Sequence, residues 1–98
     1  MEPPICGGYS QAQTPNEDIK SLVAQVKHEA ETKLGKTFNV FEAVSYTYQV
    51  VCGMNYSVKV KVGENEYVHV KIYEKLPCYG GTLELTEAEG GKSLADAL

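Results

Sequence analysis

The hydrophobic periodicity of the chain changes once, after Gly35, and this change constrains the fold more than any other feature. Before Gly35, apolar residues recur at the helical spacing of three or four positions. They are Ile19, Leu22, Val23, Val26, Ala30 and Leu34. After Gly35, apolar residues alternate with polar ones over 56–62 and 67–73, as in strands that bury one face. The pattern predicts an α+β fold, with one long helix across the concave face of an antiparallel sheet of four to five strands.

The predicted helix has signals at both ends. Thr14-Pro15-Asn16-Glu17 indicates a capping box, with Thr14 as N-cap, Pro15 in the first helical position and Glu17 reaching back to the cap. Gly35 is a typical helix terminator, because glycine adopts the left-handed conformation at low cost. We therefore expect a helix of about 20 residues, roughly 30 Å long.

The remaining segments complete the predicted sheet. Residues 63–66 form a turn between the two alternating strands, and residues 40–51 form an earlier strand. That earlier strand carries apolar residues in both registers, which predicts a bulge. A short final strand is expected over 82–86, and residues 87–98 are expected to be a loosely ordered tail. The face of the hairpin that carries the lysines and His69 is predicted to be wet.

Size and charge limit the classes of function. Ninety-eight residues form one domain, residues 1–98, which begins with an N-terminal trunk at 1–13. The net charge is −4 and all nine basic residues are lysine, so we expect no nucleic-acid partner. No apolar run reaches the roughly 20 residues of a membrane span, so no membrane partner is expected. The absence of signal-peptide features at the N-terminus and the odd number of cysteines predict a cytoplasmic location.

The candidate catalytic chemistry is sparse. Cys52 lies at a turn between strands with no helix start nearby, whereas a nucleophilic thiol usually has a pKa lowered by its surroundings. His28 and His69 are predicted to lie on solvent-facing sides of their elements. The cysteines form no C-x-x-C pair, and no glycine-rich phosphate loop precedes the helix. We therefore expect a protein that is not an enzyme and has no metal site and no cofactor.

Three segments outside the predicted helix and strands are unusually apolar. The hairpin apex Gln49-Val50-Val51-Cys52-Gly53 carries none of the Asn-Gly or Asp-Gly chemistry of an ordinary hairpin turn. The segments 76–77 (Leu-Pro) and 3–6 (Pro-Pro-Ile-Cys) are apolar as well. If the strands pair in chain order, the two hairpin connections lie at the same end of the sheet. Such a set of apolar tips predicts a surface for a partner.

These residues resemble those of the cystatin family, and more narrowly the stefins, the cytosolic type without disulfides. The similarity runs from about residue 3 to residue 86 and includes a glycine near the N-terminus, Gly7 or Gly8. It also includes the Q-x-V-x-G motif of residues 49–53, the Leu-Pro pair at 76–77 and the Y-x-H-x-K pattern of residues 67–71. The implied fold is cystatin-like, with the sheet wrapped around the helix.

The resemblance implies reversible, competitive, tight-binding inhibition of papain-like cysteine proteases such as cathepsins B, L, H and S. A three-part wedge would enter the active-site cleft without presenting a bond to the catalytic thiol. The trunk would occupy the non-primed side and the two loops the primed side. The residues implied to bind the protease are Ile5, Cys6, Gly7, Gly8, Gln49, Val50, Val51, Cys52, Gly53, Leu76 and Pro77.

The cysteines depart from the family pattern, which usually has alanine at position 52. Cys6, Cys52 and Cys78 all lie on the predicted binding edge, either by chance or as a redox control of inhibition. Val50 and Val51 favour extended structure, so straightening of the loop would allow a domain-swapped dimer, a route that the family uses. We otherwise expect a monomer.

A different class of function is a cystatin-fold binding module that inhibits no protease, because a fold does not fix a function. The two classes differ in whether Gln49, Val51 and Gly53 matter. We expect a bulky residue in place of Gly53 to abolish inhibition and to leave the fold intact.

Overall fold

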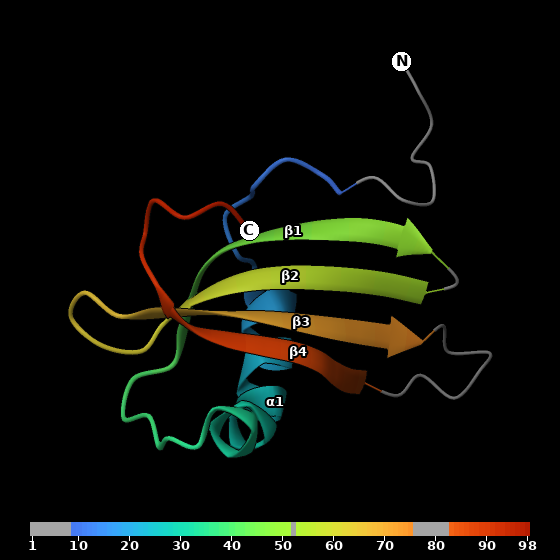
Figure 1. Cartoon of the computed structure of the whole chain (residues 1–98). Coiled ribbons are helices and arrows are strands. Elements are labelled where there is room, and N and C mark those ends of the chain that lie inside the picture. Colours follow the sequence, from blue (N-terminus) through green and yellow to red (C-terminus); the bar gives the residue numbers. More distant parts are fainter. Residues whose placement is uncertain (1–8, 52, 76–82) are drawn as a thin grey trace.

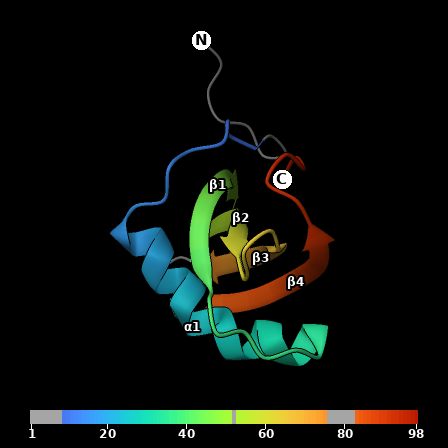
Figure 2. The same ribbon diagram turned by 90° about the vertical axis from the view of Figure 1, so that its left-hand side faces the viewer.

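The computed structural model describes residues 9–51, 53–75 and 83–98 (Figure 1). Its elements in chain order are α1 (Glu17–Leu34), β1 (Glu42–Val51), β2 (Gly53–Lys61), β3 (Tyr67–Lys75) and β4 (Leu83–Lys92). In the described residues the strands form one four-stranded antiparallel sheet in the order β1-β2-β3-β4. The helix lies on one face of this sheet, and the outer strands β1 and β4 come nearest to it (Figures 1 and 2). The α+β prediction is confirmed.

The helix begins two residues later than the capping box predicted. Its first residue is Glu17, and the N-cap is Asn16, whose side-chain oxygen accepts a hydrogen bond from the N–H of Ile19 at 2.9 Å. The prediction of Thr14 as N-cap and Pro15 as the first helical residue is wrong. Asparagine caps a helix at least as well as threonine does. The chain also reaches this point extended along β1 and needs several residues to turn into the helix.

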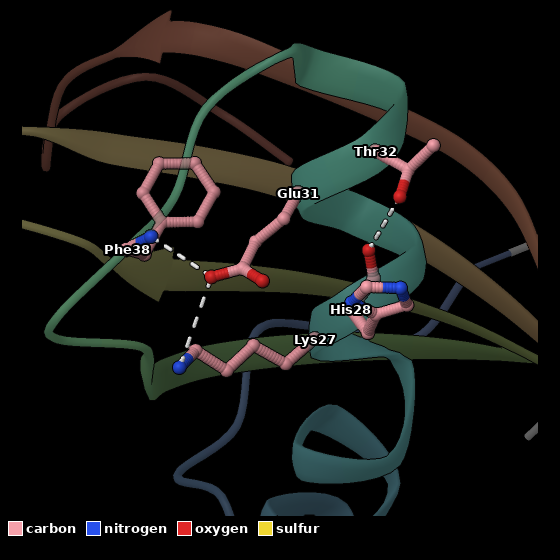
Figure 3. A network of polar contacts seen from close by, with 5 residues as sticks. All are labelled: Lys27, His28, Glu31, Thr32 and Phe38. Carbon is pink, nitrogen blue, oxygen red and sulfur yellow. Dashed lines mark hydrogen bonds and ion pairs between the residues drawn. The ribbon is translucent and has the colours of Figure 1, made fainter.

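The helix ends as predicted at Gly35, which has a left-handed φ of 67° and donates its N–H to the carbonyl of Glu31. The side chain of Glu31 then fixes the chain that leaves the helix (Figure 3). Its carboxylate accepts a hydrogen bond from the N–H of Phe38 at 2.9 Å and lies 3.8 Å from the ammonium group of Lys27. This exit directs the chain back to the start of β1.

The core lies between the helix and the facing side of the sheet. Five of the six helical stripe residues are buried, and Leu34 is half-buried at the end of the stripe. The sheet contributes the alternating aliphatic residues Val58, Val60, Val68, Val70, Ile72 and Leu85. Burial of each such side chain stabilises the fold by roughly 1.5–3 kcal/mol. Both periodicities in the sequence therefore describe the two sides of one core.

The pairing register contains the predicted bulge in β1, where the register with β2 shifts between Ala43 and Ser45. The strand β4 differs from the prediction, because it runs from Leu83 to Lys92 and includes residues 87–92, which we expected to be loosely ordered. Its register against β3 shifts near Gly90 and Gly91, and Gly91 has a φ of 67°. A glycine in this conformation forms a bulge, so the glycine pair continues the strand and does not end it.

The face of the sheet opposite the helix is exposed at Lys71, as predicted, but it is covered around Lys59. Ser57, Lys59 and His69 on this face are each less than 10% exposed, at 4%, 5% and 8%. Residues 93–98, which we call the C-terminal strap, cross this face (Figures 1 and 2). The ammonium group of Lys59 donates hydrogen bonds to the main-chain carbonyls of Leu94 and Asp96 in the strap. The prediction of a solvent-facing His69 is therefore wrong, because this return of the chain covers it.

No helix among the described residues combines the length and the apolar character needed to cross a bilayer.

Candidate functional site

Two hairpin connections leave the sheet at the same end. The pairing of β1 with β2 continues to Val51 and Gly53, which flank Cys52. Gly53 is in turn paired with Lys75, the last residue of β3, from which the chain passes toward β4. The last residues of β1 and β3 and the first residues of β2 and β4 therefore lie at the same end of the sheet (Figure 1). The strands pair in chain order, as the predicted surface requires. We call this end of the sheet the binding end.

The described part of the trunk, residues 9–13, runs antiparallel to β1 and leads toward the binding end. Gln13 exchanges two main-chain hydrogen bonds with Tyr46, at 2.8 and 3.1 Å. The N–H of Ser10 donates to the carbonyl of Tyr48 at 2.7 Å, and the Ser10 hydroxyl accepts from the N–H of Tyr48 at 3.1 Å. We call residues 9–13 the trunk root. Sequence reasoning missed this anchorage, because main-chain pairing leaves no hydrophobic pattern.

Gln49 and Val50 have different roles in the first hairpin. The side-chain oxygen of Gln49 accepts a hydrogen bond from the side-chain amide of Asn55 at 2.9 Å, and the two residues are cross-strand partners. Val50, by contrast, is 37% exposed although it is large and apolar. Gln49 therefore ties the two strands of the hairpin together, while Val50 leaves an apolar side chain exposed.

Gly53 is buried, and the packing around it excludes a side chain. Its φ is 129°, a conformation that residues with a Cβ rarely adopt. A Cβ at this position would overlap the main-chain carbonyl oxygen of Glu74 and would lie 3.2 Å from the ring and hydroxyl of Tyr73. The glycine is thus required by the pairing of β2 with β3. The expectation that a bulky substitution leaves the fold intact disagrees with this geometry.

The other predicted contacts stay predictions, because they fall outside the described residues. These are Ile5, Cys6, Gly7, Gly8, Cys52, Leu76, Pro77 and the side chain of Val51. Cys78 also falls outside them, so the redox hypothesis concerns positions that the structure does not describe.

Two ionisable groups in the sheet have shifted pKa values. The pKa of His69 is lowered, first by burial and then by the nearby charges of Lys59 and Lys92. The pKa of Tyr56 is raised, first by burial and then by Glu74, whose carboxylate lies 3.5 Å from the Tyr56 hydroxyl.

Within residues 9–51, 53–75 and 83–98, no group of three or more His, Cys, Asp or Glu side chains could hold a metal ion.

A helix on a four-stranded meander, with two hairpin connections and an N-terminal segment at one end, is the arrangement of a cystatin domain. The family model for the Cystatin domain matches residues 7–93, and the chain belongs to the cystatin family.

The similar proteins belong to the type 1 cystatins, the stefins. Cystatin-B of Oplegnathus fasciatus is 46% identical over 94 residues, which cover 96% of this chain and 94% of the relative. Cystatin-A of Felis catus is 40% identical over 94 residues, 96% of each chain. Stefin-C of Bos taurus is 40% identical over 95 residues, 97% of this chain and 94% of the relative. Cystatins and stefins are protease inhibitors and not enzymes, so this kinship supports a role in cysteine protease inhibition.

Proposed function

We propose that the chain is a reversible, competitive, tight-binding inhibitor of papain-like cysteine proteases, cathepsins included, and that it binds them through the binding end of the sheet. The observation that carries this proposal is the register that pairs Val51 with Gly53 and Gly53 with Lys75. It gathers both hairpin connections at one edge, and the trunk root leads toward that edge.

The wedge is expected to bind tightly because the fold already holds it in its binding conformation in the free protein. The Gln49–Asn55 hydrogen bond and the close packing at Gly53 hold the first hairpin, so little ordering cost arises on binding. Val50 then presents an apolar side chain to the cleft. Ile5, Cys6 and a bend at Gly7 or Gly8 fill the non-primed side, and Leu76-Pro77 fills the primed side. An interface of roughly 800 Å² per partner is enough for tight binding.

Titration of the reduced protein against papain of known active-site concentration tests the proposal, with a fluorogenic substrate as the readout. We expect a stoichiometric, reversible loss of activity. Two matched variants locate the surface, because Val50 is 37% exposed at the binding end and Val40, which precedes β1, is 44% exposed. Val50→Glu is expected to weaken inhibition by about tenfold or more, and Val40→Glu to leave it unchanged. Inhibition that both variants retain, or that the parent lacks, contradicts the proposal.

The proposed inhibitor is a cytosolic monomer that can exchange strands. Three cysteines, an odd number, favour a reducing compartment. Because β1 and β2 are paired up to Val51 and Gly53, a straightened connection would let β1 and β2 pair with a second copy. This exchange uses up the first hairpin, so we expect a dimer isolated by size exclusion to be inactive. A strand-exchanged dimer with full inhibition would contradict this.

A further inference from the structure

The buried side chain of Lys59 holds the C-terminal strap to the sheet. Lys59 lies in β2 on the face opposite the helix and is only 5% exposed. Its ammonium group donates to the carbonyls of Leu94 and Asp96. The strap turns at this point, because the Asp96 carboxylate accepts from the N–H of Ser93 at 2.8 Å and the Asp96 N–H donates to the Ser93 carbonyl at 3.1 Å. The carbonyls on either side of Ala95 therefore both accept from one ammonium group.

The hydrogen bonds of Lys59 make the position of the strap specific. An ammonium group that leaves water loses hydration free energy unless hydrogen bonds replace it, and bonds to a charged donor are stronger than neutral ones. The acceptors identified for Lys59 are carbonyls of the strap. The charged groups near its cross-strand neighbour His69 are Lys59, Lys92, Glu89 and Asp96. The free energy that offsets burial of Lys59 thus depends on the strap.

The far end of the strap lies near the trunk root. Leu98 lines a shallow pocket of about 160 Å³ together with Tyr9 and Ser10 of the trunk root, and with residues of β1, β2 and β3. Ser10 is the residue that ties the trunk root to β1 at Tyr48. In Figure 2 the strap lies on the side of the sheet away from the helix, and the trunk root runs along the β1 edge of the sheet. The strap therefore ends beside the trunk root, across this pocket, where the trunk leaves the sheet for the binding end.

We propose that Lys59 is a positioning residue for protease binding: it fixes the C-terminal strap, and the strap braces the trunk root so that the trunk leaves β1 toward the binding end. The inference rests on the proposed function and deepens it, because it assigns a role in binding to a side chain in the interior of the sheet. Lys59 acts through the strap and the trunk and does not touch the protease, since it is buried in the middle of β2.

A set of deletions and substitutions tests whether the strap braces the trunk root, with the strength of papain inhibition as the measured quantity. Lys59→Met keeps the aliphatic stem and removes the donors, and Lys59→Arg keeps donors for both carbonyls. Removal of residues 93–98 and Lys59→Met are each expected to weaken inhibition by about three- to tenfold, the scale of ordering one or two residues at an interface. The two changes together are expected to weaken it no further, and Lys59→Arg to restore it.

Removal of residues 1–8 provides the decisive background. If the strap acts through the trunk, Lys59→Met and loss of residues 93–98 have no effect on inhibition by the trunkless protein. A loss of the same size in that background would mean that the strap contacts the protease itself, and would overturn the proposal. Unchanged inhibition by the full-length Lys59→Met variant would overturn it as well.

Amide hydrogen exchange provides a readout that needs no protease. The N–H groups of Ser10 and Gln13 donate to carbonyls of β1, and we expect both to exchange faster after Lys59→Met or loss of residues 93–98. The amides between the central strands β2 and β3 serve as the control, because general destabilisation would accelerate them too. Unchanged exchange at Ser10 and Gln13 overturns the brace. If the parent does not inhibit papain, the proposed function fails while this experiment still decides on the brace.

Discussion

Gly53→Ala is the substitution whose effect the geometry defines best. Gly53 has a φ of 129°, and the place where a Cβ would stand is filled by the carbonyl of Glu74 and the side chain of Tyr73. Alanine in this conformation is strained in its own backbone and also overlaps a main-chain oxygen, which cannot rotate away as a side chain could. We therefore expect the substitution to disturb the pairing of β2 with β3 and to destabilise the whole fold.

The magnitude has two parts. A non-glycine residue in a sparsely populated backbone region costs about 1–3 kcal/mol. Insertion of a methyl group into a filled site costs about 1–3 kcal/mol more. The sum, about 2–6 kcal/mol, is a large fraction of the 5–15 kcal/mol that stabilises a typical domain. Because about 1 kcal/mol shifts the midpoint of a domain of this size by about 4–8 °C, we expect Tm to fall by at least about 8 °C.

Urea and thermal unfolding, followed by circular dichroism, measure this change, and Gly35→Ala is the matched control. Gly35 also has a positive φ, 67°, but beyond its own chain neighbours nothing lies within 4 Å of a Cβ built on it. Its substitution is expected to cost only about 1–2 kcal/mol, the penalty of the left-handed conformation. Equal destabilisation by the two substitutions would refute the steric argument. A Gly53→Ala protein as stable as its parent would refute the account of this hairpin.

Three further predictions concern the cap, the core and the buried histidine. Asn16→Ala removes the hydrogen-bond acceptor at the helix start and is expected to lower the free energy of unfolding in urea by about 1 kcal/mol. A decrease of less than a few tenths of a kcal/mol would mean that Asn16 is not the cap. Ile72 is 1% exposed, and its replacement by alanine is expected to lower the free energy of unfolding, also measured in urea, by about 2–5 kcal/mol. Because burial, Lys59 and Lys92 lower the pKa of His69 below its ordinary 6.5, the unfolded chain binds a proton more readily. Stability is then lost as the pH falls below about 6.5 toward the folded-state pKa, and His69→Gln should flatten this dependence in unfolding experiments at pH 7.5 and 5.

The elements of the fold could be predicted because each depends on local pattern. The helical stripe from Ile19 to Ala30 and the alternation around Val58 and Val70 describe which side of each element is buried, and the structure buries those sides. Gly35 ends the helix by its own conformational preference. Nothing distant in the sequence has to be known for these three predictions to succeed.

The boundaries that were missed depend on neighbours. Thr14 has the right chemistry for a cap, but Gln13 just before it is bonded to Tyr46 across the edge of the sheet. The chain cannot start a helix while it is still paired as a strand, so Asn16 becomes the cap. In the same way the glycine pair Gly90-Gly91 suggests a loosely ordered tail from the sequence, whereas pairing with β3 makes it a bulge within β4.

The candidate site shows the same division. The motif letters at 49–53 point to the binding end, yet they do not distinguish residues that contact a partner from residues that build the hairpin. The contacts of Gln49 and Gly53 assign them to the hairpin, whereas the exposure of Val50 assigns it to the surface. Lys59 is a residue whose role the local pattern misassigns, because a lysine that alternates with apolar residues normally indicates a solvated face. Only the return of residues 93–98 across the sheet makes it a buried anchor, and no local pattern in β2 encodes that return.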